Sequence, residues 1–199
     1  RSLNIASTGM LAQQLNVEVI SNNIANMNTT GFKRQRAEFQ DLLYQNIERM
    51  GSTSSSSGTV VPTGIQVGAG VKTAATYRVM SQGNMNMTEG RYDMAIEGKG
   101  FFRVRMPSGE TNYTRAGSFA LSSTGALVTN DGYAVEPGIT IPQDATDVTV
   151  NASGQVSVKL SGQTTETVVG QLDLAIFPNE AGLESLGGIL LAETVSSGA

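Results

Sequence analysis

Residues 3–28 read LNIASTGMLAQQLNVEVISNNIANMN and decide the fold of the first part of the chain. Taking every third and fourth residue selects eight positions at coiled-coil spacing, all apolar except Gln13. These positions are Leu3, Ala6, Met10, Gln13, Val17, Ile20, Ile24 and Met27. At 1.5 Å per residue such a helix is about 39 Å long. The pattern predicts a long coiled-coil-type helix whose narrow apolar seam meets another helix.

The second half of this predicted helix is rich in polar side chains, and a glycine follows it. The residues that favour helices poorly are Ser21, Asn22, Asn23, Asn26 and Asn28. Their side chains suit hydrogen bonds between packed neighbours, and Gly31 can adopt the left-handed conformation found at helix ends. An isolated helix of this kind is marginal in water. We therefore expect neighbouring copies to hold it in place; a surface helix packed on its own domain is the alternative.

From residue 71 onward the sequence predicts short β-strands separated by turns. Phe102, Val104 and Met106 alternate along one predicted strand, and Asn130-Asp131-Gly132 is typical of a tight turn. Short strands at this spacing indicate an antiparallel meander or a barrel-like sandwich. The predicted fold class is therefore mainly β with an N-terminal helical arm.

Residues 46–70 differ in composition from both neighbouring parts. They are rich in Ser and Gly, which is typical of a flexible linker. Val60, Ile65 and Val67 alternate in part, so this stretch also has the pattern of an extended strand that docks on a neighbour. We expect three parts: a helical arm over 1–45, an extended insertion over 46–70 and a β-rich domain over 71–199.

Within the arm, the apolar residues after Gly31 are spaced in a way that permits a second, short helix. These residues are Phe32, Phe39, Leu42 and Leu43. Lys33, Arg34 and Arg36 form a small basic cluster, which we interpret as a solvated helix start near acidic residues.

Composition excludes several classes of function. The chain of 199 residues has no cysteine and no histidine, which excludes disulfides, Cys/His zinc sites and Ser/His/Asp catalysis. A net charge of −4 argues against a dedicated nucleic-acid binder. No apolar run reaches the roughly 20 residues of a membrane span, and no cleavable signal is present. An export route would therefore leave no cleavable signature in these residues.

Candidate catalytic motifs are incomplete. Gly98-Lys99-Gly100 lacks the rest of a phosphate-binding loop and fits a β-bulge better. Glu89, Asp93 and Glu97 would be the carboxylates of a glycosidase pair, but their alternation is that of a solvated strand. We therefore expect no catalytic residue, no metal and no cofactor.

Four motifs carry a family resemblance. The runs Ser21–Asn26 (SNNIAN) and Thr29–Arg34 (TTGFKR) resemble the N-terminal signature of the bacterial flagellar basal-body rod and hook family. Ala95–Phe102 (AIEGKGFF) and Tyr113–Phe119 (YTRAGSF) resemble a second pattern of that family. The two patterns and their order cover most of the chain.

The resemblance implies a structural subunit of the distal rod, in which the N-terminal helix packs near the axis and the β domain forms an outer shell. Such a subunit assembles helically into the drive shaft that transmits torque from motor to hook, in the part of the basal body that spans the periplasm. Its implied partners are itself, neighbouring rod and hook subunits, surrounding ring proteins and peptidoglycan. In the family, a C-terminal helix pairs with the N-terminal one, and these residues contain none.

We assign the assembly interface to one set of residues and the stiffness of the assembled tube to another. The interface set is Leu3, Met10, Val17, Ile20, Asn23, Ile24, Asn26, Met27, Gly31 and Phe32. The stiffness set is Val60, Ile65 and Val67, because the insertion accompanies straight rods in the family. The alternatives are a proximal rod or hook subunit and, in a different class, a secreted β domain that binds or cleaves peptidoglycan.

Overall fold

The computed structural model describes residues 2–48, 50, 63–163 and 165–198, and these form two compact units. The first, which we call the arm, comprises Arg1–Met27 and Arg34–Val79. The second, which we call the β domain, comprises Asn28–Lys33 and Met80–Ala199. The expected boundaries near residues 45 and 70 differ from this division, because a strand that follows the insertion pairs with one that precedes it.

The arm consists of one helix and one long β-hairpin. The elements are α1 (Ser2–Ala25), β1 (Gln35–Asp41), β2 (Tyr44–Glu48), β3 (Ile65–Gly68) and β4 (Val71–Arg78). β1 pairs with β4 and β2 with β3, both antiparallel. The amide of Leu42 donates to the Gly70 carbonyl (2.9 Å) and that of Ala69 to the Leu43 carbonyl (3.0 Å), which joins the two ladders.

The prediction of a second short helix was wrong, because residues 35–41 form strand β1. Along this strand Gln35, Ala37 and Phe39 are half-buried while the residues between them are exposed. This period of two is the mark of a strand with one covered face. Apolar spacing around Phe39 was therefore compatible with a helix only when the polar residues were ignored.

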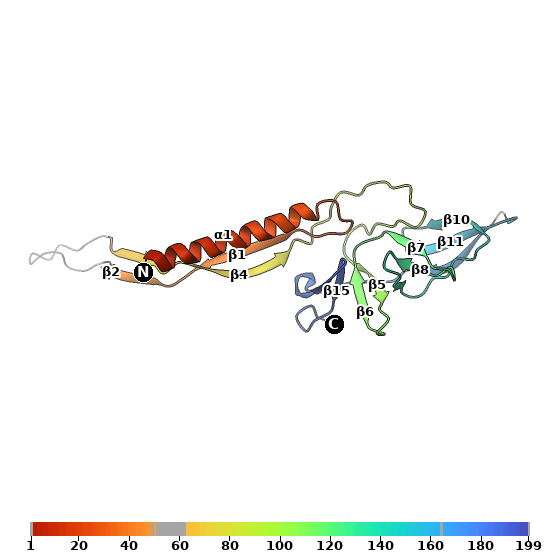
Figure 1. Cartoon of the computed structure of the whole chain (residues 1–199). Coiled ribbons are helices and arrows are strands. Elements are labelled where there is room, and N and C mark those ends of the chain that lie inside the picture. The colour runs from red at the N-terminus through yellow and green to blue at the C-terminus, as the bar shows by residue number, and fades with distance from the viewer. Residues whose placement is uncertain (1, 49, 51–62, 164, 199) are drawn as a thin grey trace, which may run out of the picture. The chain divides into compact units, whose positions relative to one another are not determined.

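Helix α1 lies along β1 and β4 and is covered by them on one side (Figure 1). Ala12 and Val19 are buried there, and Asn23 exchanges two hydrogen bonds of 2.8 Å with the backbone of Gln35. The Thr8 hydroxyl accepts a hydrogen bond from the Val71 amide (3.5 Å). The chain's own hairpin thus holds the helix, whereas we had expected neighbouring copies to do so.

The β domain contains two antiparallel sheets. Its strands are β5 (Phe101–Arg105), β6 (Thr111–Thr114), β7 (Phe119–Leu121), β8 (Leu127–Thr129), β9 (Ala134–Val135), β10 (Ala145–Val150), β11 (Gln155–Leu160), β12 (Glu166–Gln171), β13 (Leu174–Ala175), β14 (Glu184–Gly187) and β15 (Leu190–Ala192). The larger sheet has eight strands in the order β14-β15-β6-β5-β9-β8-β7, with β13 also paired to β5. The smaller sheet has the order β10-β11-β12. A mainly β, antiparallel fold with a helical arm is confirmed, and within the described residues these sheets are open rather than closed into a barrel.

Two clusters of buried side chains form the core of the β domain. The larger one contains Ile96, Phe102, Phe119, Leu127, Val135, Ile139, Val156 and Leu172. The smaller one contains Phe101, Phe177, Leu183 and Leu191. Because neighbouring residues of a strand point to opposite faces, Phe101 and Phe102 of β5 reach different clusters. The sheet is therefore covered on both faces at this point.

None of the described helices has the length and apolar content that a membrane crossing needs.

We predict that Val19→Asp frees α1 from the hairpin in the monomer. The side chain of Val19 is 8% exposed, and an unpaired carboxylate placed there would lower the opening free energy of the helix by about 2–4 kcal/mol. The measurement is hydrogen exchange of the helix amides in dilute protein. Ile20→Asp, one residue further and 48% exposed, is the control and should leave protection nearly unchanged; equal loss in both variants would contradict the packing.

Candidate assembly surfaces

One face of α1 is apolar and uncovered within the described residues. Its large side chains are Leu3, Met10, Val17, Ile20 and Ile24, all exposed, and the exposed Met27 follows in the turn after the helix. Met10 and Val17 also line an open hollow of about 680 Å³ along the helix. We call this set the seam. Its six members all belong to the predicted interface set.

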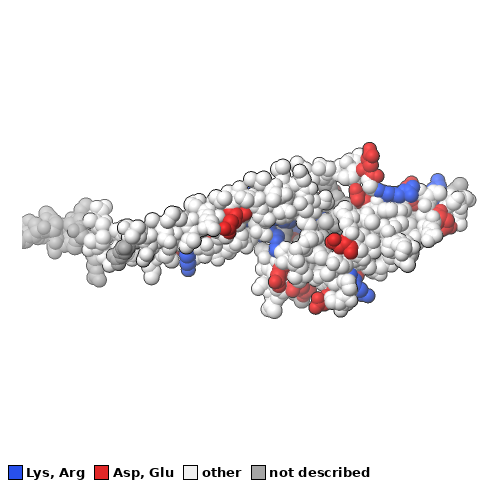
Figure 2. Space-filling view, in the orientation of Figure 1, with Lys and Arg blue, Asp and Glu red and all other residues white. Residues whose placement is uncertain are grey.

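The seam and the face that packs on the hairpin are different sides of the same helix. At 100° per residue, the five seam residues within α1 are centred about 145° from the side that carries Ala12 and Val19. Across Ser2–Ala25, all of which the structure describes, Glu18 is the only charged residue. In Figure 2, most of the visible surface of the described part of the arm is white, the colour of residues other than Lys, Arg, Asp and Glu. A helix with two apolar sides and one charge is built to be covered on more than one side.

Four members of the predicted interface set lie outside the seam. Asn23 is bonded to the chain's own hairpin, and the side-chain amide of Asn26 donates to the backbone carbonyl of Asn22 (3.0 Å). Gly31 and Phe32 belong to the β domain. The structure therefore brings six of the ten residues together on one surface.

Gly31 is held against the β domain at a position where a side chain does not fit. Its φ is +75°, and a Cβ atom there would lie 2.6 Å from the amide nitrogen of Ala116. Only glycine combines this left-handed conformation with so close a backbone approach. Two of the family-like runs, TTGFKR and YTRAGSF, thus meet at Gly31 and Ala116.

Arg115 joins the YTRAGSF run to the AIEGKGFF run. Its guanidinium donates to the carbonyls of Gly100 (2.6 Å) and Ile96 (3.1 Å) and also contacts the carbonyl of Gly98. A further bond of 2.7 Å goes to the side chain of Gln82. Burial lowers the pKa of Arg115, and Glu180 acts in the opposite direction. These hydrogen bonds from the charged guanidinium group fix the loop before β5.

Gly117 provides a second close backbone approach in the same region. Its carbonyl accepts a hydrogen bond from the Met94 amide (2.9 Å). A Cβ atom at this position would lie 1.5 Å from the Met94 carbonyl oxygen. The family-like motifs of the β domain therefore form one packed junction, which supports the domain.

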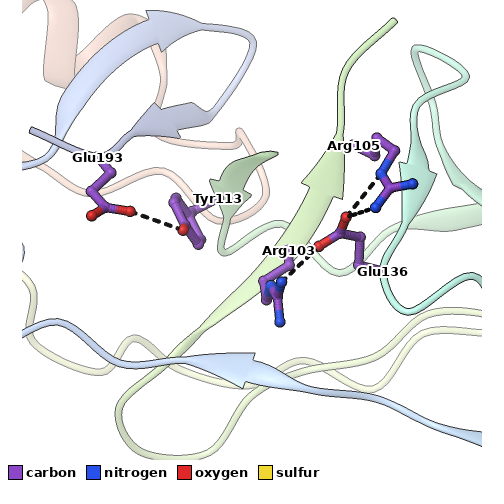
Figure 3. Close-up of polar contacts among 5 residues, drawn as sticks. All are labelled: Arg103, Arg105, Tyr113, Glu136 and Glu193. Carbon is purple, nitrogen blue, oxygen red and sulfur yellow. Dashed lines mark hydrogen bonds and ion pairs between the residues drawn. The ribbon is translucent and has the colours of Figure 1, made fainter. Parts of the chain in front are cut away.

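A row of polar side chains crosses strands β15, β6, β5 and the end of β9 (Figure 3). The Tyr113 hydroxyl donates to Glu193 (3.2 Å), and the Glu136 carboxylate lies between the guanidinium groups of Arg103 and Arg105. Burial and the hydrogen bond to Glu193 raise the pKa of Tyr113. The only signal of this row in the sequence is the alternation of Arg103 and Arg105 along β5, which by itself is typical of any solvated strand face.

The insertion extends the hairpin of the arm. Ile65 and Val67 lie in β3, paired with β2, and both remain exposed. Val60, the third residue of the stiffness set, lies outside the described residues. The expected extended strand thus exists within this chain, and contact with a neighbouring subunit stays a prediction.

Comparisons with known proteins find flagellar family matches in both units. The family described as "Flagella basal body rod protein" matches residues 3–33, and the one described as "Flagellar hook protein FlgE/F/G D1 domain" matches residues 95–158. The first match covers α1 and the turn after it, and the second covers the junction around Arg115 and most of the larger core cluster.

Several curated relatives are similar over the whole chain. The flagellar basal-body rod protein FlgG of Caulobacter vibrioides is 61% identical over 199 residues, which cover 100% of this chain and 76% of that protein. FlgG of Bacillus subtilis is 38% identical over 204 residues, covering 100% and 75%. The flagellar hook protein FlgE of Helicobacter mustelae is 43% identical over 137 residues, covering only 68% and 30%.

We predict that Gly117→Ala destabilises the β domain by at least about 3 kcal/mol, because the added methyl group has no space beside the Met94 carbonyl. Urea unfolding monitored by tyrosine fluorescence gives the free energy. Gly83→Ala is the matched control, since nothing lies within 4 Å of a Cβ atom at that position. A stable Gly117→Ala variant would show that the approach is looser than described.

Proposed function

The chain belongs to the flagellar basal-body rod protein family, and on this basis we propose that it builds the distal rod by helical self-assembly. It is a structural subunit of the rod in the flagellar basal body. The proposed assembly transmits torque from motor to hook. No catalytic step is part of this function.

The exposed seam of α1 is the observation that carries the proposal. Fully burying one large apolar side chain contributes about 1.5–3 kcal/mol. The seam presents five of them on one face of a nearly uncharged helix, with Met27 just beyond its end. This surface favours contact with helices of neighbouring subunits over contact with water. Ile24, 65% exposed near the end of α1, is a suitable probe of that contact.

The geometry of the arm favours an open assembly. The hairpin already covers the side of α1 that carries Ala12 and Val19, so within the described residues the seam stays open for helices of neighbouring subunits. A head-to-tail contact between two different surfaces produces a helical filament when its repetition does not close into a ring. Rod and hook subunits that adjoin the ends of the tube are the natural further partners.

A distal rod subunit fits the comparisons better than the hook alternative. The FlgG relatives match this chain along its full length, whereas the hook relative matches 68% of it. A β domain that acts on peptidoglycan finds no support among these relatives. We further propose that the subunit reaches the periplasm-spanning rod without a cleaved signal peptide, and that ring proteins and peptidoglycan surround it there.

The β2–β3 extension is the element that we propose to stiffen the tube. A two-stranded hairpin on its own is marginally stable in water, and here Tyr44, Ile47, Ile65 and Val67 are all exposed. Docking on an adjacent subunit would cover these side chains and add an axial contact. Extra axial contacts resist the sliding of subunits that curvature requires.

Ile24→Asp should abolish polymerisation of the full-length protein and leave the stability of the β domain nearly unchanged. A charge in a desolvated helix contact costs several kcal/mol unless it is paired. Filament formation by electron microscopy and thermal unfolding of the β domain are measured together. Asn22→Asp adds the same charge to the polar side of the same helical turn and should still polymerise; a large fall in the melting temperature with Ile24→Asp would count against the proposal.

Removing residues 44–68 should give tubes that still assemble but bend. The deletion leaves Leu42, Leu43, Ala69 and Gly70 as the loop between β1 and β4, a length that hairpins accommodate. Electron microscopy compares the curvature of these tubes with those of the intact chain. A variant with Ile65→Ser and Val67→Ser keeps the length and should bend to an intermediate degree. Equal straightness, or the loss of all tubes, would each contradict a role in stiffness.

A further inference from the structure

The cationic end of the polar row has the features of a binding site for a carboxylate. Arg103 and Arg105 are two residues apart on β5 and therefore share a face. Between them, Oε1 of Glu136 accepts a hydrogen bond from Nε of Arg105 (3.0 Å) and forms an ion pair with its Nη2 (2.8 Å), and Oε2 forms an ion pair with Nη2 of Arg103 (3.0 Å). The Glu136 amide donates to the Arg103 carbonyl (2.9 Å), which fixes the carboxylate in place.

One carboxylate does not balance two guanidinium groups. The Glu136 side chain is 10% exposed, whereas those of Arg103 and Arg105 are 41% and 65% exposed. They border a hollow of about 260 Å³ that is otherwise lined by residues 134–138. A guanidinium group has five N–H donors, so both arginines retain donors for a second acceptor. The site is thus a fixed, accessible spot with a residual charge of about +1.

The residual positive charge of this site is opposite in sign to the net charge of the β domain. The β domain has thirteen acidic and seven basic residues, a net charge of −6, whereas the arm has four acidic and six basic residues. When β domains of identical subunits pack side by side, this charge opposes the contact unless some acidic groups meet arginines. The paired arginines are already ordered by Glu136, so less side-chain entropy is lost when they bind.

We propose that Arg103 and Arg105 bind an Asp or Glu side chain from the β domain of a neighbouring copy. This inference rests on the proposed self-assembly, because a second copy is the partner. A carboxylate matches the forked geometry of arginine, and the acidic surface of the next β domain supplies it. The contact fixes the register between β domains in addition to the contact made by the helices.

The first test removes the residual charge while keeping the internal pair. In Arg103→Gln, Arg105 keeps its hydrogen bond and its ion pair with Glu136, and the new side-chain amide keeps a donor near Oε2, so the domain should unfold at nearly the same urea concentration. The critical concentration for tube formation should rise about tenfold at low salt, and the difference should shrink as salt screens the contact. Lys159→Gln removes the same charge from β11 and is the control.

The second test identifies the partner residue. Carbodiimide joins amines directly to carboxylates, and Arg105→Lys places an amine at the site. Tubes assembled from a mixture of ¹⁴N- and ¹⁵N-labelled subunits are treated and digested, and mixed-isotope peptides that link position 105 to an Asp or Glu of the β domain are expected. Monomers should give no mixed-isotope peptide.

The outcomes separate this inference from the function on which it rests. If the unaltered protein forms no tubes, the proposed self-assembly fails. If it forms tubes and Arg103→Gln assembles at the same concentration, or if position 105 links only to its own chain or to an arm, the carboxylate contact is wrong. An equal rise with Lys159→Gln would also overturn it, since net charge alone would then explain the effect.

Discussion

The packing of α1 on its own hairpin is the constraint on which the rest of the arm depends. Ala12 and Val19 are buried against β1 and β4, and Asn23 fixes the start of β1 through two backbone hydrogen bonds. An isolated helix of this length would be marginal in water, so the hairpin makes it a stable element. Because one side of the helix is occupied in this way, its second apolar side is left exposed within the described residues, in a defined orientation on the hairpin.

The β domain depends on a different kind of constraint, the close approach of backbones. Gly31 and Gly117 each lie where a Cβ atom would collide with a neighbouring main chain. Arg115 joins these segments to the loop before β5 through bonds to backbone carbonyls. The family-like motifs are thus explained by packing and hydrogen bonding, and no chemistry of a reaction site is needed to account for them.

The sequence predicted the helix, its exposed seam and the antiparallel β class, because all three follow from periodicity that is visible in single residues. It did not predict the hairpin, since Phe39, Leu42 and Leu43 satisfy a helical spacing while the alternation of Gln35, Ala37 and Phe39 is easily missed. The second apolar stripe of α1 gives only a weak signal in the sequence, because its buried members Ala12 and Val19 have small side chains. The placement of Glu136 between Arg103 and Arg105 depends on the pairing of β5 with β9, which no local pattern encodes.

The seam also has a consequence for the subunit before it is incorporated. An exposed apolar strip that suits a filament is equally available to unproductive partners while the molecule is free, and such strips promote aggregation. Under the proposed self-assembly, the concentration of free subunits has to stay low, or growth at an existing end has to be faster than the formation of new nuclei. For a subunit with so apolar a seam, the rate at which subunits are supplied therefore affects whether they assemble or aggregate.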